Sequence, residues 1–338
     1  MIKYLGSKRK LIPQIVEIIK KENVEKVIDL FAGTSRVGHA LQNEGITVLA
    51  NDHNEYAHFL ATTHVQANPE EYKELQSTID ELNRIEPKAG WFTKTYCEDA
   101  NFFHPKNGAK IEAIRNFIEA EYGPHRDDYI PEIYRILIVS LMEAADRVDS
   151  TCGQQMAYLK SWAKRAHNDL ELRVPLMSKG KGIAVRMDAA EVAKVPMELA
   201  YIDPPYNQHN YLGNYHVWET LSLWDEPETY GKAQKRVDVR SAERKSSFNS
   251  KRKILAAFQE LIDNLASPKA LVSFSDEGYL TKEELISVLE SKFGTVEVTE
   301  IPYQRYVGAK IGIYDNKGKK VGKVSHTRNK EYLFLAKD

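Results

Sequence analysis

The spacing of apolar residues along the chain follows two patterns. Short runs rich in β-branched residues are typical of buried strands, and longer stretches carry apolar residues at helical intervals of three and four positions. Near the start of the chain these patterns predict a helix over 11–23, a strand over 26–31, a helix over 35–45 that ends at a glycine, and a strand over 46–52. Strand, loop, helix and strand in this order predict a βαβ unit, which implies parallel strands and a right-handed crossover.

The middle of the chain, from about residue 66 to 180, carries mostly helical patterns. They cover residues 69–85, 109–123, 129–148 and 154–170. The third pattern is apolar nearly all round, which predicts a buried helix. This part of the chain therefore differs in class from the βαβ unit before it.

Strand patterns return after residue 180. They cover residues 183–188, 197–203, 269–276, 295–303 and 331–337, with helical patterns over 253–265 and 282–293. The simplest organisation is one α/β sheet that is built from both ends of the chain and interrupted by a helical insertion. We therefore predict a main domain of residues 1–65 and 181–338, and an insertion of residues 66–180.

The bulk composition describes an ordinary globular protein. The chain has 338 residues, of which 42% are hydrophobic and 28% are charged. No apolar run reaches the roughly 18 residues of a membrane span, and residues 1–16 lack the long apolar stretch of a secretory signal. The two cysteines, Cys97 and Cys152, make neither a disulfide framework nor a zinc motif, so we expect a protein of the reducing cytoplasm.

The net charge of −1 does not by itself indicate a nucleic-acid partner, but the basic residues are unevenly placed. Residues 231–253 hold nine Lys or Arg against two acids, and residues 304–330 hold eight against one. The second segment is typical of a hairpin that turns near residues 314–322. The first is rich in Ser, Arg and Lys and has little periodicity, so we expect it to order only on DNA.

Residues 29–38, Asp-Leu-Phe-Ala-Gly-Thr-Ser-Arg-Val-Gly, join the first predicted strand to the helix that follows. A strand that leads through a small-residue loop into a helix N-terminus is a common place for a cofactor, and Gly33 permits close approach of the backbone to a ligand. Ser35 and Arg36 stand where a dinucleotide motif needs glycine, which argues against a nicotinamide dehydrogenase. Asp52 ends the next strand and is placed to accept hydrogen bonds from ribose hydroxyls.

A second group of candidate residues follows the strand predicted over 197–203. Asp203 accepts hydrogen bonds when it is ionised, and Pro204 and Pro205 fix the backbone while leaving their carbonyl oxygens able to accept. Tyr206 supplies a face on which a flat base can stack. Because ligands of open α/β sheets bind beyond the carboxyl ends of the strands, this acceptor cluster is suited to hold an exocyclic amino group.

These motifs together resemble a known family. Residues 203–206 match the Asp-Pro-Pro-Tyr signature of N6-adenine DNA methyltransferases that use S-adenosylmethionine. In chain order, residues 3–11, 29–38 and 203–206 look like the D12 class that includes the Dam methylases. The continuation over 207–227, with 331–335, looks most like the FokI-type subgroup. The resemblance implies a Rossmann-like methyltransferase sheet and a site-specific DNA methyltransferase, expected to be part of a restriction–modification system.

The resemblance implies a cofactor site drawn from four parts of the chain. S-Adenosylmethionine is expected to contact the N-terminal motif, the loop, the strand-end acid and an acid ahead of residue 203, namely Tyr4, Lys8, Asp29, Phe31, Gly33, Asp52 and Asp188. The match at Asp188 is short, and Asp99 is a rival for the role of holding the cofactor adenine. The family's usual second glycine is Ser35 here, which leaves room for a slightly different loop conformation.

The resemblance also implies the reaction. Adenine N6 is a poor nucleophile because its lone pair is delocalised into the ring. Asp203 and the Pro204 carbonyl would accept its two N–H groups and aim the lone pair at the methyl sulfonium, with the base flipped out and stacked on Tyr206. The expected catalytic residues are Asp203, Pro204, Pro205 and Tyr206, and no metal is expected.

Double-stranded DNA is the partner that this reaction needs, and a cognate restriction endonuclease is a further expectation. We expect DNA contacts just after residue 206 and in the two basic segments, at Asn207, Tyr211, Arg240, Arg244, Lys245 and Arg305. The helical insertion is expected to read the target sequence, whereas Trp218 is expected to lie in the core.

Two other functions fit the same residues. Methylation of cytosine N4 or of RNA adenine keeps the fold and changes the substrate, although Asp203 and the Phe-Ala-Gly loop favour adenine N6 in DNA. The second alternative is an inactive nucleic-acid-binding protein on the same scaffold. The intact acids Asp52 and Asp203 argue against it.

Overall fold

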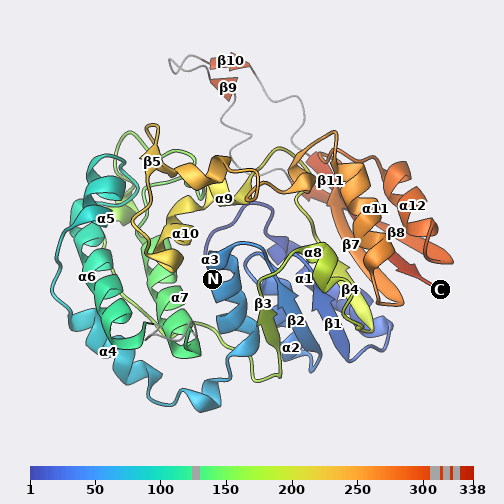
Figure 1. The fold of residues 1–338 in the computed structure, drawn as a ribbon, viewed down its shortest axis with the longest axis horizontal. Helices are drawn as coiled ribbons and strands as arrows, with labels where there is room; N and C mark the ends of the chain where they lie inside the picture. Colours follow the sequence, from blue (N-terminus) through green and yellow to red (C-terminus); the bar gives the residue numbers. More distant parts are fainter. Residues whose placement is uncertain (124–129, 305–312, 315–319, 323–327) are drawn as a thin grey trace. The chain divides into compact units, whose positions relative to one another are not determined.

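The chain folds into two compact units (Figure 1). A computed structural model describes residues 1–123, 130–304, 313–314, 320–322 and 328–338. Unit 1 consists of Met1–Val192 and Asn210–Lys245, and unit 2 consists of Ala193–His209 and Ser246–Asp338. The helices between residues 66 and 180 belong to unit 1, so the compact units have other boundaries than the predicted main domain and insertion.

Three strands of unit 1 pair with one another in parallel. They are β1 (Lys26–Asp29), β2 (Thr47–Asn51) and β3 (Ile183–Val185). Val27 pairs with Val48 and Asn51 with Val185, so β2 lies between β1 and β3. Because α2 (Arg36–Asn43) links β1 to β2, the structure confirms the predicted βαβ unit.

Unit 1 contains many helices besides α2. The others are α1 (Ile12–Lys21), α3 (Glu55–Ala61), α4 (Leu75–Arg84), α5 (Trp91–Thr93), α6 (Pro105–Tyr122), α7 (Glu132–Arg147), α8 (Ala189–Val192), α9 (Tyr211–Asn214) and α10 (His216–Leu223). α7 is buried on nearly every side, as its apolar pattern predicts, and both α3 and α10 pack against it. Residues of these three helices are part of the hydrophobic core of the unit.

The helix predicted over residues 154–170 is wrong. This stretch holds only a short 3₁₀ turn at Lys164–His167. Its carbonyl groups bond to a distant helix instead, since Asn107 Nδ2 in α6 donates to the carbonyls of Ala166 and Asn168 at 3.0 and 2.9 Å. These long-range bonds satisfy backbone groups that a helix would satisfy locally, so the spacing of the apolar residues does not decide the structure here.

The basic segment over 231–253 has a defined structure in the chain alone, so the prediction that it orders only on DNA is wrong. It contains β6 (Lys235–Arg236), which pairs antiparallel with β5 (Thr229–Tyr230), and 3₁₀ turns at Val237–Arg240 and Ser247–Asn249. Arg236, only 3% exposed, forms ion pairs with Asp225 and Asp238 at 2.7 and 3.0 Å. These ion pairs lie within unit 1, which includes the segment as far as Lys245.

Unit 2 is built on four strands in the order β4-β7-β11-β8. They are β4 (Leu199–Ile202), β7 (Lys269–Ser275), β8 (Thr295–Gln304) and β11 (Arg328–Lys337). β4 and β7 are parallel, whereas β11 is antiparallel to both β7 and β8. The helices of this unit are α11 (Ile254–Asn264) and α12 (Lys282–Glu290), and a capping box of Thr281 and Glu284 begins α12.

The predicted α/β class is confirmed, because every strand pattern of the sequence corresponds to an observed strand and parallel pairs occur in both units. The short strands β9 (Ile313–Tyr314) and β10 (Lys320–Gly322) pair antiparallel, in keeping with the hairpin predicted near residues 314–322. Among the described residues, no helix is long and apolar enough to cross a membrane.

Candidate active site

The loop between β1 and α2 contains two residues in the left-handed conformation. Gly33 has φ of +52°, and Ser35 has φ of +56° and ψ of +22°. Gly33 adopts this conformation without strain because it has no Cβ, whereas the same conformation costs Ser35 on the order of 1–2 kcal/mol. Ser35 thus takes a backbone geometry that favours the glycine for which it substitutes, and the loop keeps its tight turn.

Asp52, at the carboxyl end of β2, binds this loop directly. Its Oδ2 accepts a hydrogen bond from Gly33 N at 3.0 Å, and its Oδ1 accepts one from Asn54 N at 3.0 Å. Burial raises the pKa of Asp52, and the hydrogen bonds from Asn54 and Gly33 counter that effect. Because a carboxylate offers about four lone-pair sites, Asp52 keeps capacity to accept from a hydroxyl pair such as that of a ribose.

Tyr4 packs on the same loop from the N-terminal motif. A Cβ at Gly33 would lie 3.3 Å from Tyr4 Cε1, so the ring covers the side of the loop that glycine leaves open. The Tyr4 ring also stacks on Tyr215 and Tyr211, with centroids 4.5 and 5.2 Å apart, and its hydroxyl bonds that of Tyr56 at 3.0 Å. Tyr4 is therefore fixed between the loop and the segment that follows residue 206.

Asp188 lies just beyond β3, beside the end of β2. Met187 N donates to Asn51 Oδ1 at 3.0 Å, which ties this turn to β2. The Asp188 side chain is exposed and accepts a hydrogen bond from Ala190 N at 2.8 Å. Its rival Asp99 lies at the end of a π-helical turn in the helical part of the unit, with no strand before it, and the choice of Asp188 stays a prediction.

The remaining predicted cofactor residues belong to the same part of unit 1. Lys8 is buried in a short 3₁₀ turn, Lys8–Lys10. Asp29 is the buried last residue of β1, and Phe31 is half-buried two positions later. The structure thus brings the loop, the N-terminal motif and the ends of β1, β2 and β3 together in one unit.

The predicted base-binding residues follow β4 in unit 2. Asp203 is half-buried and Pro204 is buried. The Tyr206 carbonyl accepts a hydrogen bond from Tyr279 N at 2.8 Å, and the Tyr206 ring lies 5.5 Å from Phe274 at a tilt of 53°. Tyr206 is thus held at one edge by Phe274 and by a backbone bond.

The turn after Tyr206 is also held within unit 2. Asn249 Nδ2 donates to the carbonyls of Asn207 and His209 at 2.7 and 3.0 Å. Asn207 Oδ1 in turn accepts from His209 N at 3.1 Å, so its amide group closes a local turn. The side chain of the predicted DNA contact Asn207 therefore already accepts a hydrogen bond from the backbone.

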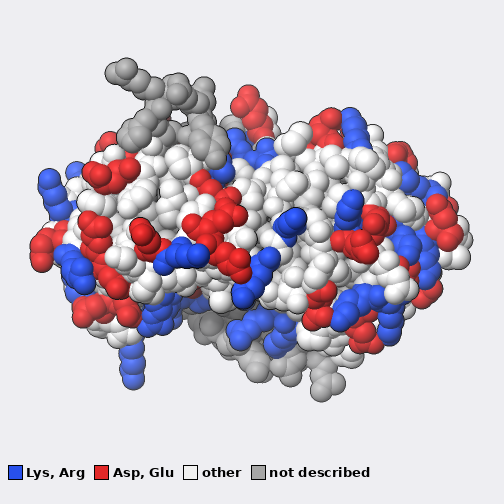
Figure 2. Space-filling view, turned by 90° about the horizontal axis from the view of Figure 1, so that it is seen from below, with Lys and Arg blue, Asp and Glu red and all other residues white. Residues whose placement is uncertain are grey.

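The predicted DNA contacts of the basic segment differ in their surroundings. Arg240 is exposed, and its guanidinium lies over the Tyr230 ring at 3.5 Å from the centroid. Lys245 is exposed, whereas Arg244 forms an ion pair with the fully buried Glu219. On the face shown in Figure 2, acidic and basic side chains are interspersed, so bulk surface charge does not mark a DNA site there.

Three further predictions concern residues outside the range 231–253. Tyr211 begins α9 and stacks on Tyr4, and its role as a DNA contact stays a prediction. Trp218 is 1% exposed, which confirms it as a core residue. Arg305 lies outside the described residues, and its assignment stays a prediction.

Sequence reasoning missed Glu219, which lies in α10 one turn after Tyr215. It accepts hydrogen bonds from Glu55 N and Tyr56 N, more than 160 positions earlier in the chain. No local pattern indicates its distant partners.

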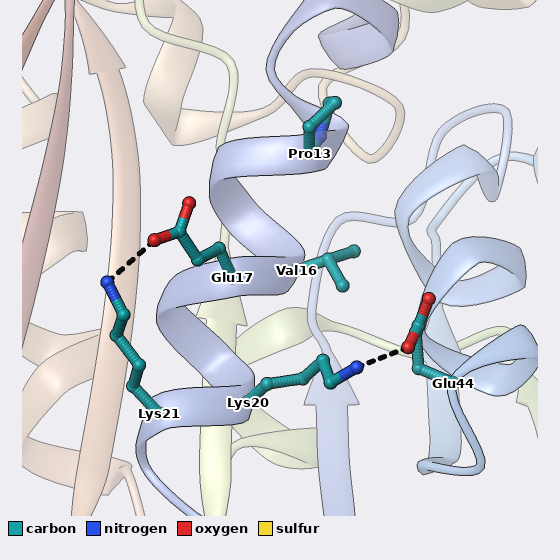
Figure 3. Close-up of a pocket in the computed structure, with 6 residues that line it drawn as sticks. All are labelled: Pro13, Val16, Glu17, Lys20, Lys21 and Glu44. Atoms are coloured by element: carbon teal, nitrogen blue, oxygen red, sulfur yellow. Dashed lines mark hydrogen bonds and ion pairs between the residues drawn. The ribbon is translucent and has the colours of Figure 1, made fainter.

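One open depression on the surface of unit 1 lies apart from these residues (Figure 3). It is lined by Pro13, Val16, Glu17, Lys20, Lys21 and Glu44. Lys21 pairs with Glu17 at 2.7 Å and Lys20 with Glu44 at 2.5 Å, so its charges are already neutralised. In the part of the chain that the structure describes, no group of three or more His, Cys, Asp or Glu side chains could hold a metal ion.

Together these features define an α/β protein with a tight loop, bound by the acid that follows the next strand, at the carboxyl ends of parallel strands. The chain belongs to the D12 class N6 adenine-specific DNA methyltransferases, whose family model matches residues 4–288. This confirms the resemblance that the sequence motifs predict. Membership of this family also argues against the nicotinamide dehydrogenase considered for the glycine loop.

Three curated relatives agree with this assignment. Modification methylase StsI of Streptococcus sanguinis is 32% identical over 324 residues, which cover 90% of this chain and 49% of StsI. Type II methyltransferase M.FokI of Planomicrobium okeanokoites is 31% identical over 328 residues, with 90% and 50% covered. Type II methyltransferase M.NlaIII of Neisseria lactamica is 29% identical over 342 residues, with 97% and 99% covered.

The chain thus spans about half the length of StsI and M.FokI and nearly the whole of M.NlaIII. Among solved structures, the methyltransferase domain of bacterial-CtHen1-C aligns with 98% of this chain and 99% of its own, at 11% identity and a TM-score of 0.30. At that TM-score the likeness adds nothing to the assignment, which rests on the family.

Proposed function

We propose that this protein transfers a methyl group from S-adenosylmethionine to N6 of adenine within a specific sequence of double-stranded DNA. The observation that carries the proposal is the family match over 4–288, with the Asp-Pro-Pro-Tyr sequence directly after β4. The relatives are named as modification methylases or type II methyltransferases, which supports a role in a restriction–modification system. A cognate endonuclease and a cytoplasmic location are parts of the same proposal.

The residues of unit 1 fit S-adenosylmethionine, which supplies an activated methyl group on sulfur when it is bound. Gly33 makes the tight turn of the loop without a side chain, and Asp52 is a half-buried acceptor that remains partly available for ribose hydroxyls. Tyr4 covers the loop with an aromatic face. Asp188, beside the end of β2, is the acid proposed to hold the adenine of the cofactor.

The residues of unit 2 fit the target base. Asp203 and the Pro204 carbonyl are hydrogen-bond acceptors that can take the two N–H groups of an adenine amino group. Accepting both favours a pyramidal nitrogen whose lone pair points away from the acceptors, which is the geometry of an in-line displacement. Tyr206 offers its ring as a stacking surface for a base that has left the duplex.

DNA binding is proposed for three basic residues and for the helical part of unit 1. Arg240 and Lys245 would contact phosphates, as would Arg305. The helices between residues 66 and 180 are proposed to read the target sequence. Arg244 is kept here only as part of this surface, because its guanidinium is engaged by Glu219.

Nucleoside mass spectrometry of unmethylated DNA incubated with the protein and S-adenosylmethionine tests the proposal. N6-methyladenine is expected with the wild type and with Asp263→Ala, a control at an exposed acid of α11. It is expected to be absent with Asp203→Ala. N4-methylcytosine in the product would replace the proposed base, and no methylated base in DNA would redirect the search to RNA or to an inactive binder.

A further inference from the structure

Glu219 is a fully buried carboxylate with no part in the proposed reaction. It lies in α10 and is 0% exposed. Its Oε2 accepts a hydrogen bond from Tyr56 N at 3.0 Å, and its Oε1 accepts one from Glu55 N at 3.3 Å. These amides belong to the first two residues of α3, where the helix itself provides no acceptor. Glu219 therefore completes the N-terminal turn of α3.

The other partner of Glu219 comes from the basic segment. Arg244 forms an ion pair with Glu219 Oε1, and its side chain is 19% exposed. Burial raises the pKa of Glu219, whereas Arg244 and the amide of Tyr56 act in the opposite direction. A buried carboxylate that loses its cation is strongly destabilised, so Arg244 keeps Glu219 in the form that α3 needs.

The turn that Glu219 holds leads directly to the cofactor loop. Asn54, which precedes α3, donates from its backbone N and its Nδ2 to Asp52 Oδ1 at 3.0 and 3.3 Å. The other oxygen of Asp52 accepts from Gly33 N. Tyr56 also bonds the hydroxyl of Tyr4, which covers the same loop. A displacement of the first turn of α3 would thus reach both Asp52 and Tyr4.

We propose that Glu219 and Arg244 are positioning residues that couple the basic segment to the cofactor site. Through α3 they set the position of Asp52, so that phosphates bound at Arg240 and Lys245 and cofactor bound at the loop strengthen each other. This coupling rests on the proposed function. It is reciprocal, because two ligands that are linked in this way change each other's affinity by the same factor.

Calorimetric titration with S-adenosylhomocysteine, without DNA, tests the positioning. Arg244→Gln and Glu219→Gln are each expected to raise the Kd about tenfold at unchanged stoichiometry. Arg244→Lys should restore most of the affinity, and the double variant should bind no worse than either single one, since both break the same link. Lys232→Gln, a charge-matched change at an exposed lysine of the same segment, should bind as the wild type does.

A merely structural role for the pair gives a different result. It would lower the melting temperature or the fraction of protein able to bind, while the Kd of the folded molecules stayed the same. Wild-type affinity in both single variants, or a double variant whose loss equals the sum of the single losses, would overturn the proposal. Adding an unmethylated DNA fragment should tighten binding in the wild type and not in Arg244→Gln; equal tightening in both would overturn the coupling.

A further measurement distinguishes failure of the proposed function from failure of the positioning role. If the wild type binds no S-adenosylhomocysteine, the methyltransferase assignment fails, and the link is then measured by hydrogen exchange of the backbone amides. The amides of Glu55 and Tyr56 should exchange faster in Glu219→Gln and in Arg244→Gln than in the Lys232→Gln control. Unchanged exchange at these amides would overturn the positioning role itself.

Discussion

Tyr4 lies face to face with Tyr215, with ring centroids 4.5 Å apart and planes 16° from parallel. The two residues are far apart in the sequence of unit 1, since Tyr4 belongs to the N-terminal motif and Tyr215 directly precedes α10. The Tyr215 hydroxyl also accepts a hydrogen bond from Leu5 N at 2.5 Å. The segment after the Asp-Pro-Pro-Tyr sequence therefore fixes the motif that covers the cofactor loop.

Two substitutions at Tyr4 distinguish the contribution of its ring from that of its hydroxyl group. Tyr4→Phe keeps the stack on Tyr215 and loses only the hydroxyl contact with Tyr56, so we expect a Kd for S-adenosylhomocysteine within about threefold of the wild type. Tyr4→Ala removes the ring and is expected to weaken binding about tenfold or more. Calorimetric titration of both variants measures the difference. Equal affinities for the Ala and Phe variants would show that the ring does not shape the cofactor site.

Gly33 is a position of the loop where a side chain would be strained and would meet Tyr4. Gly33→Ala places a Cβ at φ of +52° and 3.3 Å from Tyr4 Cε1, so we expect about 1 kcal/mol of destabilisation and a cofactor affinity about tenfold lower. Gly45→Ala is the matched control, because Gly45 also has a positive φ, +84°, but a Cβ there meets nothing within 4 Å. Urea unfolding and calorimetric titration of both variants give the two quantities.

The two glycine variants should thus lose similar stability and differ in cofactor affinity. If Gly45→Ala weakened the cofactor as much as Gly33→Ala does, backbone strain alone would explain the loss. The contact between the loop and Tyr4 would then have no role in binding.

Much of the fold follows from local pattern. β1 and β2 are β-branched runs that end in loops, and α7 is a helix whose residues are mostly apolar and buried. Local sequence pattern does not predict the structure of residues 154–170. Their carbonyls bond Asn107 of a helix some 60 positions away, and no window of neighbouring residues contains that information.

The residues of the candidate site also divide into those that local sequence predicts and those that it does not. Gly33 and Asp52 are predictable because a loop and a strand end limit what each residue can do. Glu219 is not, since its role depends on amides 163 and 164 positions away. Arg244 lies in a basic stretch of sequence that is typical of a protein surface, yet its partner is a buried acid. Composition alone therefore overestimates the number of arginines that are available to DNA.

Arg240 is the arginine of the basic segment best placed for a phosphate. Its guanidinium is held over Tyr230 at 3.5 Å, which orients its donors without using them. We expect Arg240→Ala to reduce the slope of log affinity against log salt by about one and to weaken all DNA sequences alike. Lys21→Ala, at an exposed lysine of α1, is the control. Filter binding at several salt concentrations measures the slope, and an unchanged slope would remove Arg240 from the DNA surface.

His64 gives the stability of the protein a predictable dependence on pH. It is fully buried, with Nδ1 2.7 Å from the Leu176 carbonyl and Nε2 3.6 Å from Glu143. Burial lowers the pKa of His64 to about 4, an effect that Glu143 only partly offsets. The unfolded chain, in which a histidine titrates near 6.5, therefore binds a proton that the folded chain does not bind in the range from about 6.5 down to 4.

Stability from His64 is thus present above pH 6.5 and is lost as the pH falls towards 4. His64→Asn removes the titration while leaving a donor where Nδ1 stands. Between pH 7 and pH 5 we expect the wild type to lose about 2 kcal/mol more free energy of unfolding than the variant. Asp146, whose pKa burial raises to about 6, acts in the opposite sense in both proteins and cancels in the comparison. Urea unfolding of both proteins at the two pH values gives the difference, and equal losses would mean that His64 accepts a proton without opening the fold.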